Sequence, residues 1–215
     1  MATALKIFGC VISLYLCSVT TAAPWVLNKE ENGVKVFVRD TPNSAFRAFK
    51  GVTTFPVNLS AVVAALDDVK AYPKYLHQFK SAKVLRKISD TESIRYIVTN
   101  MPWPVKDRDV VIHSRLNQNP QSKQVIISLN GEPKTAKQQV GLVRIQKMQG
   151  RWVLTPQGKN SVTVAYEMSV DPGGNIPKWL VNTLSVDIPF YTLSNLRKLV
   201  QQPIYRQAKL SYITE

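Results

Sequence analysis

Cysteine is scarce in this 215-residue chain, since its two copies, Cys10 and Cys17, both lie near the N-terminus. Beyond position 17 the chain can form no disulfide and offers no thiol nucleophile or cysteine–zinc site. Histidine is equally rare: His77 and His113 lie in unrelated segments, at a spacing that supports no metal site. A glycine-rich phosphate loop and a Gly-x-Ser-x-Gly elbow are missing as well. The sequence predicts no metal, no cofactor and no enzymatic activity.

Long apolar runs are lacking after the first 20 residues. Lys6 precedes an apolar run over residues 7–19, and small residues in "TTAA" follow it, which is typical of a secretory signal peptide cut after Ala22. The run is shorter than the roughly 20 residues that span a bilayer, so an uncleaved anchor is the weaker alternative. We expect a signal peptide over 1–22, one domain over 23–215 that acts as a monomer, and a location in the periplasm.

Acidic residues are few: 14 stand against 28 lysines and arginines, and without Lys6 the balance is 27 − 14 = +13. Such an excess attracts polyanions, either nucleic acid or an anionic membrane surface. The basic residues are scattered, and an exported chain rarely meets nucleic acid. We therefore expect peripheral contact with anionic membranes and no nucleic-acid partner, with a merely solubilising surface as the alternative.

Strand signals dominate the rest of the chain and surround one short helix. A helix is expected over 57–68, capped by Asn58 or Ser60. Alternation is clearest in "SVTVAYEMSV", where Val162, Val164, Tyr166 and Met168 share one face. Period-2 patterns and turn residues predict strands over 34–40, 45–55, 80–88, 92–99, 108–116, 123–130, about 140–147, 151–156 and 161–170.

A long amphipathic helix follows "DPGGNIP" at residues 171–177. One apolar face contains Trp179, Val186, Phe190, Leu193, Leu196, Val200 and Ile204. A second stripe in its first half contains Leu180, Leu184, Ile188 and Tyr191. Pro189 is expected to bend the helix. A helix with two apolar faces over an antiparallel sheet indicates a lid above a cavity, although ordinary core packing explains one of the two stripes.

The segment "MPWPVKDRD", residues 101–109, places a tryptophan between two prolines. Pro102 and Pro104 predict an exposed bend, because proline lacks an amide donor and fixes its own backbone angle. Trp103 would suit a membrane interface, where an apolar ring with one N–H group is favoured. The alternative is that Trp103 folds back onto the protein as an anchor for the loop.

Three segments together resemble the START family, the lipid-transfer domains related to the steroidogenic acute regulatory protein. They are "WVL…GVKVFVR" near the start, "MPWPVKDRD", and "RWVLTP…VTVAYEMSVDPGGNIPKWLVN" near the end. The resemblance implies an α+β helix-grip fold, in which a curved antiparallel sheet wraps around a long C-terminal helix and encloses an apolar tunnel. It also implies that one lipid or sterol-like ligand is bound and transferred between membranes. A lipid sensor, or a cyclase- or hydrolase-like enzyme of the same fold, are the alternatives.

The resemblance and the alternation together give a set of candidate site residues. The cavity would be lined by Arg108, Val162, Val164, Tyr166, Met168, Leu180 and Leu184. The tunnel mouth and its membrane contact would comprise Trp103, Pro104, Ile176, Pro177 and Trp179, with Gly173 and Gly174 as a hinge.

Arg108 matches a family arginine that can face the cavity and meet a lipid's polar group. A buried arginine needs a partner. Asp107, Asp109 and Glu167 are the candidate partners, and an exposed salt bridge at a strand end is the alternative to burial.

Overall fold

A computed structural model describes residues 23–41, 46–174 and 176–215, so the expected signal peptide lies outside the described residues. Ten strands form one sheet, in the order β1-β2-β3-β10-β9-β7-β6-β5-β4, with β8 beside β6. All pairs are antiparallel except β6 with β8. The strands are β1 (Val26–Glu31), β2 (Val34–Arg39), β3 (Ala48–Phe55), β4 (Phe79–Ser89), β5 (Glu92–Thr99), β6 (Arg108–Gln118), β7 (Val125–Gly131), β8 (Val143–Arg144), β9 (Lys147–Pro156) and β10 (Val162–Asp171).

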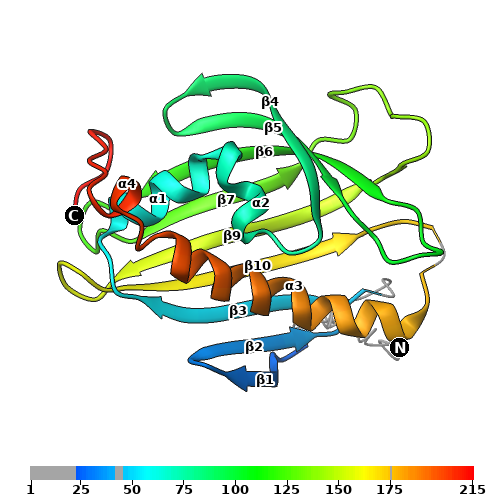
Figure 1. The fold of residues 1–215 in the computed structure, drawn as a ribbon, viewed down its shortest axis with the longest axis horizontal. Coiled ribbons are helices and arrows are strands. Elements are labelled where there is room, and N and C mark those ends of the chain that lie inside the picture. The colour runs from blue at the N-terminus through cyan, green and yellow to red at the C-terminus, as the bar shows by residue number, and fades with distance from the viewer. Residues whose placement is uncertain (1–22, 42–45, 175) are drawn as a thin grey trace, which may run out of the picture.

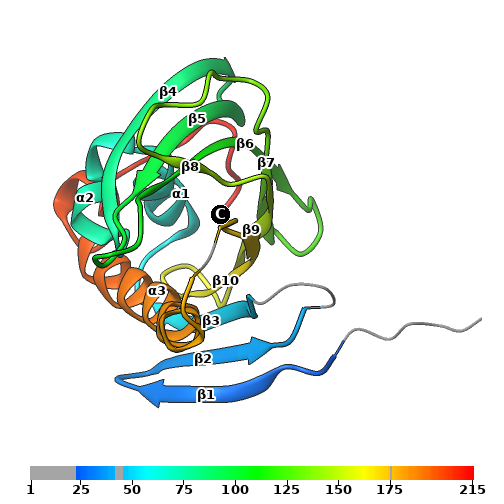
Figure 2. The ribbon, with the colours of Figure 1, turned by 90° about the vertical axis from the view of Figure 1, so that its right-hand side faces the viewer.

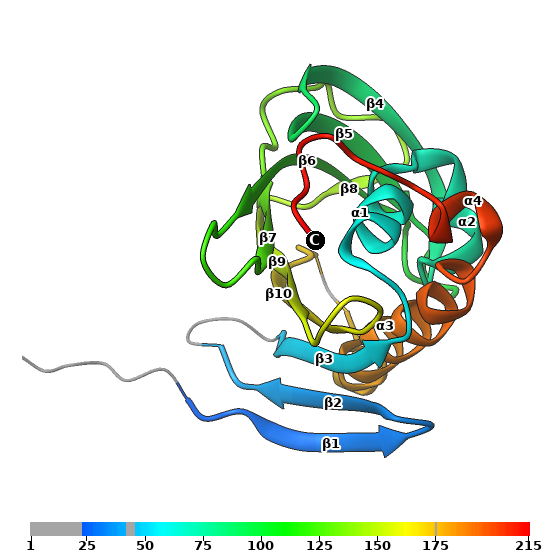
Figure 3. The ribbon, with the colours of Figure 1, turned by 90° about the vertical axis from the view of Figure 1, so that its left-hand side faces the viewer.

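The helices lie on the concave side of this sheet (Figure 1). They are α1 (Leu59–Asp67), the 3-10 turn η1 (Val69–Ala71), α2 (Tyr72–Tyr75), α3 (Lys178–Leu199) and α4 (Pro203–Arg206). The sheet curls around them, and α3 runs alongside β3 (Figure 2). Helix α1 and the C-terminal tail lie at the end of the molecule away from the start of α3 (Figure 3). This is the α+β helix-grip architecture.

The long helix approaches the sheet most closely at Gly51 on β3. A Cβ atom there would lie 2.5 Å from Leu193 Cδ1 and 3.0 Å from Pro189 Cβ, so only glycine lets the two elements meet without a shift. Beneath this contact lies the main core, which includes Phe55, Val62 and Leu196. Asn58 Oδ1 accepts a 2.9 Å hydrogen bond from the amide of Ala61, which confirms Asn58 as the α1 cap.

The outer face of β5 and β6 is also buried. Ile94, Tyr96, Val98 and Val111 form a second apolar cluster beneath Ala136 and Leu142, which belong to the segment between β7 and β8.

A buried ion pair fixes that covering segment. Asp109 and Arg144 are 0% and 2% exposed and lie 2.8 Å apart, and Arg144 also donates to the carbonyls of Pro133, Ala136 and Lys137. Burial alone would raise the pKa of Asp109, but hydrogen bonds from Arg144 and Tyr96 outweigh it and hold the pKa below its ordinary value. The sheet is therefore covered on both faces along β5 and β6.

The sheet does not close, so β1 and β4 remain edge strands. Nearly all of β4 is exposed, including Val84, Leu85 and Ile88. The same strand carries four basic residues: Lys80, Lys83, Arg86 and Lys87.

The expected elements are corrected in three places. The sequence pattern does not predict strand β1, because "VLNKEE" has only two apolar residues. The strand lies at the edge of the sheet and pairs with β2. Gly150 lies inside β9 and not between two strands, while β8 is limited to two residues. Helix α3 ends at Leu199, so the exposed Ile204 belongs to α4 and not to the face that begins at Trp179.

Candidate functional site

A cavity lies between the concave face of the sheet and the helices. The volume that the centre of a water-sized sphere can reach inside it is about 220 Å³. One water molecule needs only roughly 10–15 Å³ by this kind of measure, so the cavity has room for a larger molecule. Its walls are largely apolar and include Val110, Ile112 and Leu116 of β6, Ile127 and Leu129 of β7, Met148 and Trp152 of β9, Tyr166, Met168 and Val170 of β10, and Leu184, Ser185, Ile188 and Thr192 of α3.

An aromatic group forms part of the sheet wall. The rings of Trp152 and Tyr166 stack with centroids 3.9 Å apart, and Phe49 meets Tyr166 edge-on at 5.2 Å. The Tyr166 hydroxyl lies 3.8 Å from Met168 Sδ. Burial raises the pKa of Tyr166 well above its ordinary value, so this residue stays a neutral phenol.

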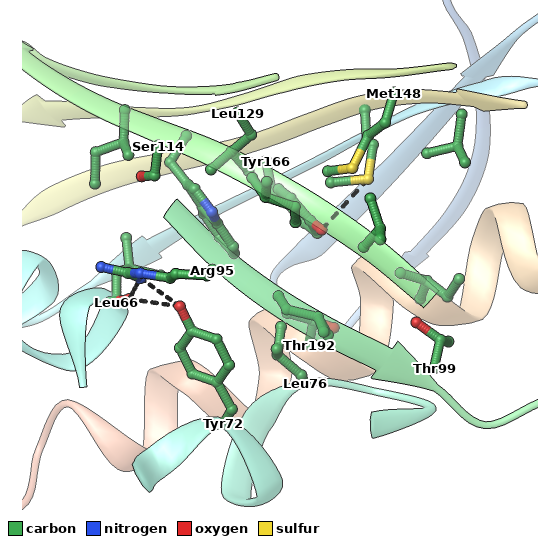
Figure 4. A pocket seen from close by; sticks show the side chains of 18 of the residues that line it. Leu66, Tyr72, Leu76, Arg95, Thr99, Ser114, Leu129, Met148, Tyr166 and Thr192 are labelled. Carbon is green, nitrogen blue, oxygen red and sulfur yellow. Dashed lines mark hydrogen bonds between the residues drawn. The ribbon is translucent and has the colours of Figure 1, made fainter. Parts of the chain in front are cut away.

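One end of the cavity is polar because of Arg95, a residue on the concave face of β5 (Figure 4). Only 8% of Arg95 is exposed. Its Nε donates to Ser93 Oγ at 3.0 Å, and its Nη1 donates to Leu66 O at 3.0 Å and to the Tyr72 hydroxyl. Its Nη2 donates to Asp67 at the end of α1.

Arg108 occupies the other polar end, at the start of β6. It is 3% exposed, and its Nη2 donates to Gly173 O at 3.0 Å while Nη1 donates to Lys106 O. Its Nε is buried and has no hydrogen-bond partner among the described residues. Burial lowers the pKa of Arg108 from its ordinary value. The alternative of an exposed salt bridge is therefore wrong for Arg108.

The carboxylates expected near Arg108 pair elsewhere. Asp107 accepts from Lys80 at 2.6 Å, Asp109 faces Arg144 on the other side of the sheet, and Glu167 meets Arg151 at 2.8 Å. Backbone carbonyls take their place. Arg108 thereby joins the loop before β6 to the segment that leads into α3.

The described residues of these two segments, 100–107 together with 172–174 and 176–179, form what we call the mouth of the cavity. Trp103 is 91% exposed and Trp179 is 64% exposed, so Trp103 does not fold back as an anchor. Pro104 and Pro177 are also exposed, while Ile176 is half-buried.

The backbone of the mouth is held at two points. Asp107 Oδ1 accepts from the amide of Met101 at 2.9 Å, which braces the Trp103 loop. Gly173 and Gly174 have φ angles of +63° and +67°, a region that favours glycine. The expected hinge residues therefore have the conformations that a side chain would disfavour.

The structure places the expected cavity residues in two groups. Arg108, Tyr166, Met168 and Leu184 line the cavity. Val162, Val164 and Leu180 are buried but do not line it, which corrects the expected wall. Val162 and Val164 point the same way as Tyr166, but the core cluster that contains Leu193 and Leu196 fills their end of β10.

Sequence reasoning missed the Arg95 end completely. Arg95 alternates with Ile94 and Tyr96, so the pattern alone favours the apolar residues as the inner face. The structure reverses this, because the segment between β7 and β8 buries the outer face. The one sequence feature that could have indicated this wall is that Arg95, Ile97 and Thr99 share one face of the strand. A face of that composition is also typical of a solvent-exposed surface.

Residues 23–41, 46–174 and 176–215 contain neither a metal-binding cluster nor a membrane-spanning helix. No group of three or more His, Cys, Asp or Glu side chains in these ranges is arranged to hold a metal ion. None of the helices there is both long and apolar enough to cross a bilayer.

The fold and the cavity define a class: helix-grip proteins that enclose an apolar chamber reached through a mouth beside the long helix. Within that class the chain belongs to the START domain family, whose model matches residues 18–203.

Relatives and solved structures agree with this membership. An uncharacterised protein of Pseudomonas aeruginosa is 35% identical over 181 residues, covering 84% of this chain and 89% of that protein. The phosphatidylcholine transfer protein of Mus musculus is 24% identical over 171 residues, covering 75% and 77%. The crystal structure of a STAR-related lipid transfer protein from Xanthomonas axonopodis matches with a TM-score of 0.76 and 33% identity, covering 83% of this chain and 99% of that one.

Proposed function

We propose that the protein binds one lipid or sterol-like molecule in its cavity and transfers it between membranes as a monomer. The observation that carries this proposal is a largely apolar chamber whose mouth presents an almost fully exposed tryptophan, Trp103. Burying apolar surface of the ligand would supply about 25 cal/mol per Å² removed from water.

The mouth supports a route for exchange. The hydrogen bond from Arg108 to Gly173 O holds the start of the hinge beside the Trp103 loop, and its loss would help α3 to move away. Gly173 and Gly174 would absorb the change in backbone angle. Trp103 and Trp179, on the two sides of the mouth, would lie in the membrane while the ligand passes. Arg108, with its unpaired Nε, would meet a polar group of the ligand on its way.

Charge and the N-terminal segment support the setting. The formal balance of +13 after residue 22 favours anionic bilayers, and salt should weaken that contact because screening acts within about 8 Å at physiological ionic strength. The apolar run over 7–19 and the small residues up to Ala22 support export and a periplasmic location. The first residue of the mature protein, which should be Ala23, tests this part.

The cavity favours a carrier over an enzyme. Its two buried guanidinium groups lie at different ends, and that of Arg95 is already bonded to Asp67, Ser93, Leu66 and Tyr72. An enzyme would need titratable groups that converge on one reacting bond.

Native mass spectrometry of the protein purified from its own host tests the proposal. We expect one bound lipid per chain, recovered unmodified. Transfer of that lipid between donor and acceptor vesicles should then rise in proportion to protein concentration. Binding without transfer would identify a sensor, and a chemically altered ligand would identify an enzyme; either result would contradict the carrier proposal.

A further inference from the structure

The Arg95 end of the cavity is built differently from its surroundings. Arg95, Ile97 and Thr99 share the concave face of β5, so a buried guanidinium stands on a wall whose other members are mostly apolar. Removing an arginine from water is costly unless it is paired, so this placement needs a reason. Figure 4 shows Arg95 and Tyr72 together at one side of the cavity and Thr99 at the other.

The counter-ion of Arg95 is only partly buried. The side chain of Asp67 is 38% exposed, whereas that of Arg95 is 10% exposed. Asp67 also has a second basic partner, Lys87, whose Nζ lies 3.2 Å from Asp67 Oδ2. If Asp67 released Arg95, its charge would remain paired at the surface while the guanidinium would be left without a carboxylate.

The guanidinium retains a capacity for a further acceptor. It has five N–H donors. The described contacts use Nε once, Nη1 twice and Nη2 once, which leaves one Nη2 hydrogen.

Two hydroxyl-bearing residues, Tyr72 and Ser114, line the cavity at this end. Ser114 lies opposite Ser93 in the β5–β6 register and lines the cavity, and among the described residues no hydrogen bond to its hydroxyl is found. Burial raises the pKa of Tyr72, so its hydroxyl stays protonated, and in this structure it donates to Leu66 O at 3.4 Å.

From this geometry we propose that Arg95 is the anchor for an acidic oxygen group of the ligand, a carboxylate or a phosphate, and that Asp67 occupies its place in the empty cavity. On binding, the ligand's oxyanion takes the Nη2 donors of Arg95, and Asp67 stays with Lys87. Ser114 donates to the same group, and Tyr72 does so once its hydroxyl leaves Leu66 O. This inference rests on the proposed lipid-binding function and adds the charge of the ligand to it.

Matched ligands test the inference in the full mature chain. Oleic acid, oleyl alcohol and oleoyl lysophosphatidic acid share one acyl or alkyl chain, and each would compete with an NBD-labelled diacylglycerol. We expect an acidic probe to bind at least about tenfold more tightly than oleyl alcohol, since hydrogen bonds to charged groups are the stronger ones. Whichever acidic probe shows the larger ratio identifies carboxylate or phosphate as the preferred source.

Two variants give opposite changes. Arg95→Gln should remove the preference for acid and leave the affinity for oleyl alcohol within about twofold of that of the unaltered protein. Asp67→Asn should raise the affinity for the acidic probe several-fold, because the internal competitor is gone. A pair that served only to stabilise the fold would give no such gain. Arg86→Gln, a surface change on β4, is the matched control and should alter neither affinity.

Three results with the variants would overturn the inference, and a fourth comes from the unaltered protein. The three are an acid preference that survives in folded Arg95→Gln, a loss of acid affinity in folded Asp67→Asn, and a preference that disappears in Arg108→Gln instead. Arg95→Lys guards against a folding defect, since it keeps the charge and should keep part of the preference. If all three probes fail to bind, the proposed lipid-binding function itself is contradicted. Equal binding of acid and alcohol contradicts only the role of Arg95.

Discussion

The two ends of the cavity each contain a buried arginine, yet the two are held in different ways. Arg108 donates to backbone carbonyls of two segments at the mouth and has no carboxylate. Arg95 donates to one backbone carbonyl, that of Leu66, but also to a carboxylate, a tyrosine and a serine beneath α1 and α2. Counted along β5 from Thr99, which pairs with Arg108, the two positions are four residues, or roughly 13 Å, apart.

The difference shows how the surroundings decide what a buried charge can do. Carbonyl acceptors join Arg108 to the two segments of the mouth, so that arginine is suited to control the proposed opening. A side-chain acceptor with a second partner at the surface can leave Arg95 without moving the backbone. That arginine is suited to exchange one partner for another.

Filling the space between the two ends should have the largest effect. Leu129 lines the cavity and pairs with Ser114 across β6 and β7. Leu129→Trp should weaken lipid binding by more than about tenfold while the protein remains folded. Val164→Trp is the matched change in the filled core, where overpacking should lower the free energy of unfolding by about 1–3 kcal/mol. Lipid titration and urea unfolding distinguish them, and equal lipid binding by Leu129→Trp and the unaltered protein would show that the ligand lies elsewhere.

Breaking the Arg108 contact should loosen the mouth alone. Arg108→Gln removes the donors to Gly173 and Lys106, which are worth about 1–3 kcal/mol to the closed arrangement. Amide hydrogen exchange over the first two turns of α3 should quicken by about tenfold, with little change in β5. Arg86→Gln serves as the surface control. Faster exchange around Arg95 as well would mean that the two ends open together.

Removing the exposed ring at the mouth should slow transfer by several-fold. Trp103 is almost fully exposed, so Trp103→Ala should leave thermal stability and the binding of a soluble short-chain lipid unchanged. Transfer rates between vesicles, melting curves and short-chain binding are measured on the same preparation. A stable variant with normal transfer would remove Trp103 from the proposed route.

The smallest effect is expected from pH. Burial lowers the pKa of His77, a cavity residue, although the nearby charge of Asp187 opposes this. The folded protein therefore holds fewer protons than the unfolded chain just below pH 6.5, and stability present above that pH is lost as the pH falls. The free energy of unfolding should decline modestly between pH 7.5 and 5.5, and less so in His77→Gln. An identical decline in both proteins would assign the pH dependence to other groups.

Much of the fold could be predicted because local patterns and tertiary contacts agree. The alternation over 161–170 matches β10, and the two apolar stripes after Trp179 match a helix that packs on the sheet and also lines a cavity. The exposed loop at the mouth could also be predicted from the sequence, since the prolines on both sides of Trp103 favour a bend that projects the ring outward. The glycine pair at 173 and 174 likewise indicated unusual backbone angles.

The Arg95 end could not be predicted because its meaning depends on distant segments. Arg95 is a cavity residue only because residues far along the chain cover the opposite face of β5. The cavity wall on β10 stops before Val164 because side chains of α3 and α1 fill the space beneath that part of the sheet. The local alternation of apolar and polar residues shows neither how far the helices fill the space beneath the sheet nor whether a distant segment covers its outer face.

Because the sheet is open, its edge strands affect how readily copies of this protein associate with one another. An exposed strand with free amide and carbonyl groups is a template for joining another strand, and charged side chains, lysine above all, prevent this. Strand β4 presents such an edge, with Lys80, Lys83, Arg86 and Lys87 among its exposed apolar residues. Part of the positive charge therefore keeps neighbouring molecules apart, and neutralising all four positions at once would favour aggregation of folded protein.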